Sequence, residues 1–391
     1  MDIDGPGETA DDVTLQPETQ QPQQPEEAQD KQTAAIDLAQ LLFVVGHIAI
    51  KQIVHLELCE LDFKRRKQDQ EKDKPVSNSS PEKTSQTPAA RRKKGSNQPE
   101  PPKEEEQDEL AMIGGTTEDD FTEAITHIRE RELLYSRQSL LALYGPLVTE
   151  ICANNTLYAS RHLQAQATLT LAKLMCVSSE YCEANLPLLI TILERSPDPI
   201  VRSNAVIALG DMAVCFNHLI DENTDFLYRR LQDADDSVKR TCLMTLTFLI
   251  LAGQVKVKGQ LGEMAKCLED SDRKISDLAR MFFTELATKD NAVYNQFVDM
   301  FSILTQAGSL EGGILEEEAL KRILKFLCGF IEKDKHAKNL AEKLAARLNR
   351  CENERQWNDT AFALGLLNNG KSEDIEKKVK EGYRVVDATA A

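Results

Sequence analysis

An internal repeat of 37 residues constrains the fold of this chain more than any other feature. Asp198, Asp235 and Asp272 recur at that spacing. Each stands where its carboxylate can accept hydrogen bonds from the first free backbone amides of a following helix. Pro199, directly after the first aspartate, suits the first position of a helix. Periods of about 20 to 50 residues are typical of stacked repeat arrays, so this spacing predicts one.

Four apolar columns follow the predicted caps. They comprise Val201, Val238 and Ile275; Ala205, Cys242 and Ala279; Leu209, Leu246 and Phe283; and Met212, Leu249 and Leu286. A further copy lies upstream at Leu163, Ala167, Leu171 and Leu174. This spacing places each set on one stripe of a helix. The preceding helix of each unit is expected to end near Leu193, Leu231 and Leu268, so each repeat is one antiparallel helical hairpin.

One such hairpin cannot cover its own apolar face, whereas hairpins stacked side by side bury a continuous core. The period is longer than the ~34 residues of tetratricopeptide repeats and the ~33 of ankyrin repeats. The Trp-Leu-Gly and Thr-Pro-Leu-His patterns of those repeats are also missing. We therefore predict an all-α fold, an α-solenoid of HEAT or armadillo type, with HEAT repeats as the favoured interpretation.

Changes in composition divide the chain into six segments. We expect a disordered acidic, Gln-rich segment at 1–32, a helical hairpin of the array at 33–66, a disordered linker at 67–108, HEAT repeats at 109–310, a C-terminal helical cap at 311–383 and a tail at 384–391. Gly46 is the expected break within the hairpin, and a helix over 138–153 is expected to be interrupted near Gly145 and Pro146. The cap is expected to contain helices near 314–333, 336–350, 354–368 and 372–383.

The overall charge and the cysteines restrict the class of protein. A net charge of −17 argues against a surface that binds nucleic acid everywhere, although a local basic stripe is compatible with it. The nine cysteines form no CxxC pair and lie mostly in apolar helical patterns, which predicts buried, reduced thiols. The longest apolar run, from Leu38 to Ile50, is shorter than the roughly 20 residues of a membrane span, so we expect a soluble protein without a membrane partner.

Catalytic and metal-binding motifs are absent from the sequence. It contains no phosphate-binding Gly-rich loop, no His-Glu-x-x-His pair and no Gly-x-Ser-x-Gly elbow. The six histidines are dispersed, and His47 and His55 are more simply explained as packing or surface residues than as metal ligands. We expect a protein that is not an enzyme and that has no metal and no cofactor.

The repeat region also carries a family resemblance. From Asn155 to about Ile303 the sequence, including NTLYASRHLQAQATLTLAKLMCVSS, PDPIVRSNAVIALGDMAVCFN and LYRRLQDADDSVKRTCLMTLTFLIL, resembles the central HEAT segment of condensin's non-SMC chromosome-condensation subunits. FVVGHIAIKQIVHLE at Phe43–Glu57 and ERQWNDTAFALGLL at Glu354–Leu367 are similar to the subunit 1 branch rather than to its condensin II relative. Members of this family are longer, so the chain corresponds to their C-terminal part, as a fragment or a truncated gene product.

The resemblance implies a scaffold that binds the kleisin subunit and the SMC ATPase heads and helps to hold chromosomal DNA during mitosis. It implies a location in the nucleus and on chromosomes, and in the cytoplasm for part of the cell cycle. ATP hydrolysis would belong to the SMC partners. The alternative interpretation is another HEAT scaffold, such as a cohesin regulator, a nuclear import receptor or a vesicle-coat adaptor.

Basic residues recur at or near the starts of the second helices of the repeats. They are Arg161, Arg202, Lys239, Arg240, Arg273 and Lys274. Stacking would align them along one edge, where they could contact DNA phosphates or acidic segments of a partner. The alternative is that each pairs with an aspartate of a neighbouring repeat and only holds the stack together.

The linker contains two kinds of regulatory motif. Ser80-Pro81-Glu82-Lys83 matches the full pattern of proline-directed cell-cycle kinases, and Thr87-Pro88 is a shorter match. The basic cluster Arg91, Arg92, Lys93 and Lys94 resembles a nuclear import signal, although a solvated run of charge explains it equally well.

If a cell-cycle kinase acts on the linker, phosphopeptide mapping of mitotic cells should find phosphate on Ser80 and on Thr87. Each phosphate adds nearly two negative charges to an accessible segment. Mitotic samples in which both residues are covered and both are unmodified would refute this prediction.

Overall fold

The structure is a computed structural model. It describes residues 26–73, 117–255, 260–289, 291–305, 315–351 and 353–368, together with 377 and 380. Within these ranges the secondary structure is helical and contains no strand.

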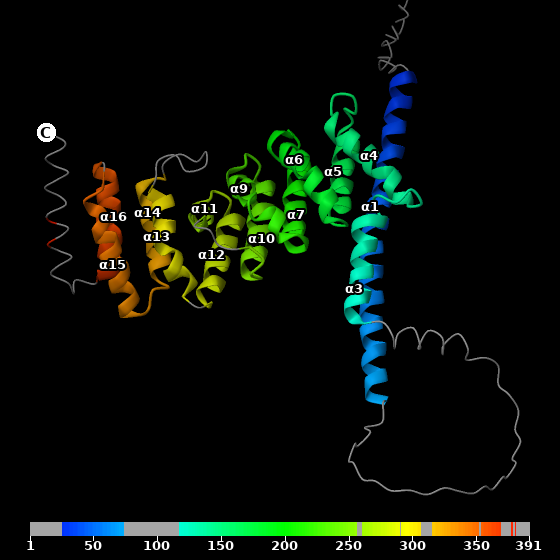
Figure 1. The fold of residues 1–391 in the computed structure, drawn as a ribbon. Coiled ribbons are helices and arrows are strands. Elements are labelled where there is room, and N and C mark those ends of the chain that lie inside the picture. Colours follow the sequence, from blue (N-terminus) through cyan, green and yellow to red (C-terminus); the bar gives the residue numbers. More distant parts are fainter. Residues whose placement is uncertain are drawn as a thin grey trace, which may run out of the picture.

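The helices follow one another along the array in chain order (Figure 1). They are α1 (Glu26–Asp73), α3 (Glu118–His127), the π-helix η1 (Ile128–Glu132), α4 (Leu140–Ala153), α5 (Arg161–Met175), α6 (Ser179–Arg195), α7 (Pro199–Cys215), α8 (Asn217–Ile220), α9 (Thr224–Arg229), η2 (Arg230–Gln232), α10 (Asp236–Leu251), α11 (Leu261–Lys266), η3 (Cys267–Glu269), α12 (Arg273–Ala287), α13 (Ala292–Thr305), α14 (Glu317–Cys328), α15 (Asp334–Leu348) and α16 (Glu354–Asn368).

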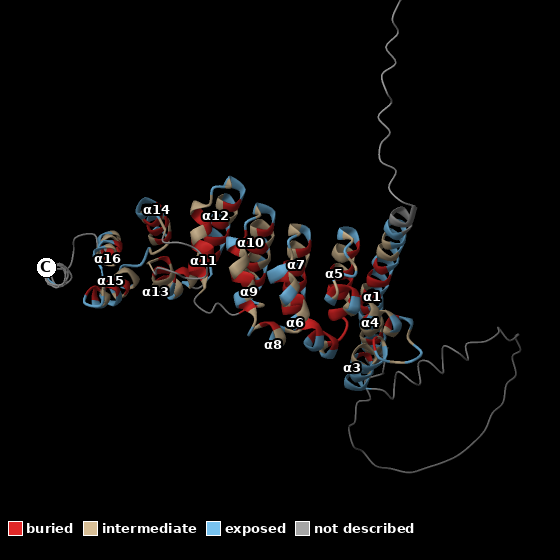
Figure 2. Ribbon diagram, turned by 90° about the horizontal axis from the view of Figure 1, so that it is seen from above, coloured by how far each residue is buried: buried red, intermediate tan, exposed pale blue. Residues whose placement is uncertain are grey.

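The helices form two layers. Helices α5, α7, α10 and α12 lie in one layer, and α4, α6, α9 and α11 lie in the other, with the buried residues between them (Figure 2). Helices α5, α7 and α10 each pack on the second helix of the next unit and on their own hairpin partner. The predicted α-solenoid of stacked antiparallel helix pairs is confirmed.

The three predicted aspartate caps are present. Asp198, Asp235 and Asp272 each accept a hydrogen bond from the backbone amide two residues ahead, at 2.9 Å in every case. Ser160 takes the same place before α5, where its hydroxyl accepts from the amide of Leu163. Such a cap stabilises a helix by about 1 kcal/mol, and here it also fixes where each second helix begins.

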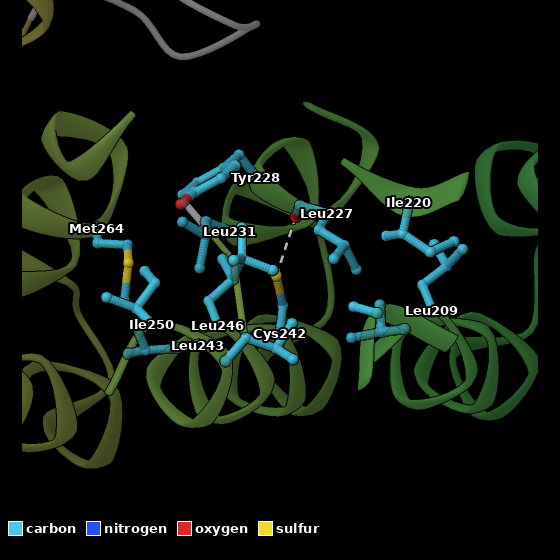
Figure 3. Packing of buried hydrophobic residues seen from close by; sticks show 14 of the residues in the cluster. Leu209, Ile220, Leu227, Tyr228, Leu231, Cys242, Leu243, Leu246, Ile250 and Met264 are labelled. Carbon is cyan, nitrogen blue, oxygen red and sulfur yellow. Dashed lines mark hydrogen bonds between the residues drawn. The ribbon is translucent and has the colours of Figure 1, made fainter. Parts of the chain in front are cut away.

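The predicted apolar columns form the core. All sixteen residues of the four columns are buried, and Leu209, Leu246 and Phe283 have no exposed surface. Figure 3 shows Leu209 and Leu246 pointing into the space between the two layers. The thiol of Cys242 in the same core donates a hydrogen bond to the backbone oxygen of Leu227 at 2.9 Å, which ties the two helices of one unit together.

The second helices approach one another closely at glycines. A Cβ on Gly210 of α7 would lie 2.5 Å from Cγ2 of Thr245 on α10. A Cβ on Gly46 of α1 would lie 3.3 Å from Oγ1 of Thr170 on α5. Thr170 and Thr245 stand at the same position of their helices, ten residues after the cap. The helix α1 therefore holds the place of the second helix of a preceding repeat.

The predicted hairpin over 33–66 is wrong. One continuous helix, α1, runs from Glu26 to Asp73, so it begins inside the segment expected to be disordered and extends into the expected linker. Gly46 does not break it, because the missing side chain is what allows α1 to pack on Thr170. A glycine inside a helix costs about 1 kcal/mol relative to alanine, which this packing outweighs. The sequence from 26 to 73 also contains no proline.

The helix α1 is long and apolar enough to cross a membrane by length and composition, with a mean hydropathy of 1.8 in its most apolar window. The uninterrupted apolar run ends at Ile50, before Lys51, so the sequence predicted too short a segment for a membrane span. Leu42, Val45 and Ala49 are buried, and α1 packs along α5 as a member of the array. Its opposite face exposes Leu41, among other apolar residues.

The predicted interruption of the helix at Gly145 and Pro146 is also wrong. The helix α4 is continuous with Pro146 inside it. The carbonyl of Gly145 accepts hydrogen bonds from the hydroxyls of Thr149 at 3.1 Å and Tyr181 at 3.2 Å. Tyr181 belongs to the neighbouring helix α6, so this contact joins α4 to α6 beside the proline, whose missing amide removes one hydrogen bond of α4.

Three of the four helices expected in the C-terminal cap correspond to α14, α15 and α16. The fourth, near 372–383, lies outside the described residues apart from 377 and 380. Trp357 of α16 is half-buried and packs against the core, as expected of a packing residue. Most of the segments expected to be disordered, and the tail, lie outside the described residues.

The glycine contact can be tested with a matched pair of substitutions. Gly210→Ala should lower the thermal unfolding temperature, because the added methyl group meets Thr245, and overpacking typically costs about 1–3 kcal/mol. Gly365→Ala in α16 should raise it slightly, because no atom lies within 4 Å and alanine favours the helix. Thermal melting followed by circular dichroism measures both. Adding Thr245→Ala to Gly210→Ala should restore stability; equal stabilisation by both alanines would contradict the contact.

Candidate partner-binding surface

Three of the six basic residues predicted to face a partner instead join neighbouring repeats. They form the ion pairs Arg161–Asp198, Arg202–Asp233 and Lys239–Asp270. Each basic residue lies in the first turns of α5, α7 or α10, and each aspartate belongs to the next unit. The alternative reading of the basic stripe, as a set of contacts within the stack, therefore describes these three residues.

The pair between Arg202 and Asp233 is the most enclosed. Two parallel hydrogen bonds of 2.8 and 3.0 Å join the guanidinium to the carboxylate. The two side chains are only 12% and 3% exposed, and Arg230 contacts the same carboxylate at 3.3 Å. Removing one partner of such a pair leaves a charge without compensation in a region poor in water. This pair serves to fix one repeat on the next.

The other two pairs, Arg161–Asp198 and Lys239–Asp270, shift the pKa values of Asp198 and Lys239. The Arg161 guanidinium hydrogen-bonds to Asp198 and holds the pKa of that carboxyl below its usual value. Burial works to lower the pKa of Lys239, but hydrogen bonds to Asp236 and Asp270 outweigh it and the pKa is raised. Both shifts favour the charged forms, so the pairs remain ionised at neutral pH.

The other three predicted basic residues have no ion pair to a neighbouring repeat among the described residues. Lys274 is exposed and Arg240 is half-buried. The side chain of Arg273 is 92% exposed and pairs only with Asp277 of its own helix, at 3.5 Å. These are the residues of the predicted stripe whose charge is open to a partner.

A second feature of the same layer is a row of exposed apolar side chains that the sequence analysis missed. We call it the apolar ladder, and it consists of Phe43, Leu169, Ile207, Met244 and Met281. Its members come from the successive helices α1, α5, α7, α10 and α12. Leu169 is half-buried, and the other four are between 47% and 68% exposed. Five stacked helices thus present one apolar residue each to solvent.

The ladder follows from the repeat. Ile207, Met244 and Met281 each stand six residues after the first core column, as Leu169 does after Leu163. Phe43 precedes Gly46 by three residues, as Ile207 precedes Gly210. The sequence therefore contains the ladder as a further apolar column, beside the four columns that form the core. Only the stacking of the helices shows that this column faces solvent.

Neighbouring side chains widen the ladder. Phe248, 61% exposed, lies one turn after Met244 on α10. Lys173 lies 5.3 Å from the centre of the Phe43 ring, in a cation–π contact. A shallow apolar hollow between α1 and α5, lined by residues that include Ile36 and Gln166, continues the surface at its N-terminal end. An extended apolar surface rimmed by polar groups is typical of a protein-binding site.

Histidine and cysteine side chains offer no metal site in the described part of the chain, which contains no group of three potential ligands. The ring of His47 stacks on Phe43, and His55 lies 3.7 Å from the sulfur of Cys59. All nine cysteines are free, and five are buried as predicted. Cys215 is an exception: it is exposed, because it ends α7 where the helix leaves the core.

The regulatory motifs of the linker lie outside the described residues. Ser80, Thr87 and the cluster Arg91 to Lys94 therefore stay predictions from the sequence.

Comparison with solved structures finds repeat proteins of related architecture at low similarity. A computationally designed armadillo repeat protein is 16% identical, covers 56% of this chain and 98% of its own, and has a TM-score of 0.31. An engineered protein is 17% identical and covers 70% of each chain, with a TM-score of 0.32. Such low scores add nothing to the fold established from the helices themselves.

Comparison with known sequences identifies a protein family. The family model described as non-SMC mitotic condensation complex subunit 1 matches residues 200–365. Condensin complex subunit 1 of Saccharomyces cerevisiae is 51% identical over 360 residues, which are 92% of this chain and 29% of the relative. The Schizosaccharomyces pombe protein is 50% identical over 95% of this chain and 30% of its own, and the human protein is 39% identical over 84% and 22%.

The chain spans less than a third of the length of these relatives. The relatives carry the condensin name rather than that of a cohesin regulator, an import receptor or a coat adaptor. The match includes the repeats whose caps, core columns and ladder are described above. On this combination of repeat structure and sequence identity, the chain belongs to the condensin complex subunit 1 family and corresponds to a C-terminal part of its members.

Proposed function

We propose that this chain is part of a non-catalytic scaffold subunit of condensin that acts in mitotic chromosome condensation. Membership of the condensin complex subunit 1 family supports this role. The stacked helices present extended surfaces of the kind on which a scaffold binds its partners. The subunit would work in the nucleus and on chromosomes, and would be cytoplasmic for part of the cell cycle. The SMC ATPase heads, as partners, would supply ATP hydrolysis.

Within this role, the apolar ladder is the proposed binding surface for a segment of the kleisin subunit. The observation that carries the proposal is that α1, α7, α10 and α12 each expose one apolar ladder residue, with the half-buried Leu169 of α5 between the first two of them. Met244 is 57% exposed, so a partner that covers it removes about half of its apolar surface from water, which contributes about half of the 1.5–3 kcal/mol of full burial.

The spacing of the ladder indicates what kind of segment fits it. Packed helices lie about 8–10 Å apart, so successive rungs are separated by a similar distance. An extended chain in the polyproline II conformation advances about 3.1 Å per residue, or about 9 Å in three residues. A kleisin segment with an apolar residue at every third position would therefore place one side chain on each rung.

We expect Ile207→Glu combined with Met244→Glu to weaken binding of a kleisin fragment at least tenfold. Two central rungs would become charged, and a tenfold loss corresponds to about 1.4 kcal/mol. The measurement is fluorescence anisotropy with labelled kleisin fragments and the purified chain.

Leu157→Glu is the matched control, because Leu157 is 73% exposed but lies in the turn before α5, away from the ladder. It should bind kleisin as the unchanged chain does. Unchanged affinity of the double ladder variant, with its thermal unfolding temperature preserved, would exclude the ladder as the kleisin surface.

Arg240, Arg273 and Lys274 are the proposed contacts to DNA phosphates. None of the three has an ion pair to a neighbouring repeat among the described residues, whereas Arg161, Arg202 and Lys239 each pair with an aspartate of the next unit. The net charge of −17 restricts such contacts to a local edge. Phosphate contacts of this kind would give affinity without sequence preference.

If this edge binds DNA, Arg240→Glu with Lys274→Glu should weaken binding and flatten its dependence on salt. Each lost phosphate contact reduces the slope of log K against log salt by about 0.9. Titrations of duplex DNA at several salt concentrations measure the slope.

Arg202→Gln provides the contrast, because it breaks the enclosed pair with Asp233. It should lower the unfolding temperature and leave the slope unchanged. A double reversal with unaltered affinity and slope would leave the basic residues with a structural role alone.

A further inference from the structure

The repeating surface of the apolar ladder does not by itself fix where a partner begins. Its rungs stand at equivalent positions of helices that pack about 8–10 Å apart. An extended kleisin segment with an apolar residue at every third position could shift by one rung and keep most of its contacts. A single register requires a site that occurs at only one place along the ladder.

Such a site lies at the N-terminal end of the ladder, in the hollow between α1 and α5. Its walls are mostly apolar and belong to α1: Ile36, Ala39, Phe43 and Val44. Phe43 is also the first rung of the ladder, so the hollow and the ladder form one continuous surface. The hollow has a volume of about 480 Å³. Since a cavity of ~150 Å³ already holds benzene, the hollow has room for a bulky apolar side chain.

The hollow forms because Ala39 is small. Ala39 lies about one helical turn from Ile36 and from Phe43, and its methyl group leaves a gap between these two larger side chains. The residue at the same position of the repeat is Ala165 in α5, Ser203 in α7, Arg240 in α10 and Asp277 in α12. The position therefore changes from apolar to charged along the array.

A second position of the repeat follows the same trend. Three residues before Arg240 and Asp277 stand Ser237 and Lys274, in the place that Ile36 holds on α1. An apolar side chain placed between α10 and α12 would therefore cover polar and charged groups and remove them from water, which is unfavourable. A bulky apolar side chain fits the ladder at its α1 end instead.

Polar side chains that also line the hollow indicate an extended peptide as its occupant. They are Gln40, His162 and Gln166. Within the described ranges, the side chains of Gln40 and His162 form no hydrogen bond, and that of Gln166 donates one, to Oγ1 of Thr170 at 3.3 Å. These groups can pair with backbone amides and carbonyls of an extended segment, which need partners when they are covered. A helix would not need them, because its backbone groups bond to one another.

We propose that this hollow receives one bulky apolar side chain of the kleisin segment that lies on the ladder, and that this anchor sets the register of the segment. The inference rests on the proposed binding of kleisin to the ladder and adds a chemical pattern to it. The segment carries Leu, Phe or Trp as the anchor and an apolar residue at every third position beyond it. From Phe43 to Met281 the ladder extends over four helix spacings, about 32–40 Å, which corresponds to about twelve residues of extended chain.

Filling the hollow from within tests the anchor. Ala39→Trp occupies the space with a large side chain, and should weaken binding of a labelled kleisin fragment to the purified full chain at least tenfold in fluorescence anisotropy. Ile36→Gln, at an exposed position, makes one wall polar and should weaken binding at least threefold. The matched control is Ala184→Trp, because Ala184 is exposed on α6 in the other layer; it should bind as the unchanged chain does. Circular dichroism shows whether each variant is folded.

The register of the segment is measured separately. When benzophenone-alanine replaces each apolar residue of the fragment in turn, one position should cross-link to α1 and α5 around the hollow. In Ala39→Trp the cross-links from that position should spread to α7 and α10, because the segment can then bind one or two rungs further along. A substitution that only disturbed the folding of the chain would reduce cross-linking without moving it.

The hollow and the ladder can fail separately. If Ala39→Trp and Ile36→Gln bind the fragment as the unchanged chain does, whereas Ile207→Glu with Met244→Glu loses binding, the hollow is not an anchor and the ladder remains the kleisin surface. Cross-links that stay at one register in Ala39→Trp would also overturn the anchor. Unchanged binding of the double ladder variant would refute the proposed function, and the anchor with it.

Discussion

The whole array depends on apolar faces that a helix pair cannot cover alone. Leu209, Leu246 and Phe283 are completely buried, and each is buried by the neighbouring unit as well as by its own hairpin. Stability of such a protein is a sum of units and of the contacts between adjacent units. The glycine and threonine contacts set how closely the second helices approach, and the enclosed Arg202–Asp233 pair sets the alignment of one unit on the next.

How far the sequence predicts this structure depends on whether a feature repeats. The aspartate caps and the buried columns recur at a fixed spacing, so both could be located without coordinates. The helix α1 occurs once, and its Gly46 has the sequence appearance of a break. Its role as a packing contact depends on Thr170, which is more than a hundred residues away in the chain. Local sequence cannot distinguish these two uses of glycine.

In the candidate surfaces too, the sequence locates the residues, but only the fold shows which of them are accessible. The basic residues were recognised by their position near helix starts, but only the fold separates Arg202, enclosed by Asp233, from Lys274, which is exposed. The ladder residues also recur at a regular spacing. From sequence alone, however, a recurring apolar residue is taken for a core residue, and only the stacked structure shows that these side chains face solvent.

The exposed face of α1 has a related explanation. If Gly46 holds the place of Gly210, then Leu41, Val44 and Ile48 hold the places of Ala205, Ala208 and Met212. The latter three are buried in α7 by its neighbours, whereas the former three are 40–49% exposed. The helix α1 thus has the two apolar faces of an internal member of a stack, and only one of them is covered among the described residues. Apolar residues on two faces also account for its membrane-like hydropathy, because a helix stacked on both sides has little polar surface left to present.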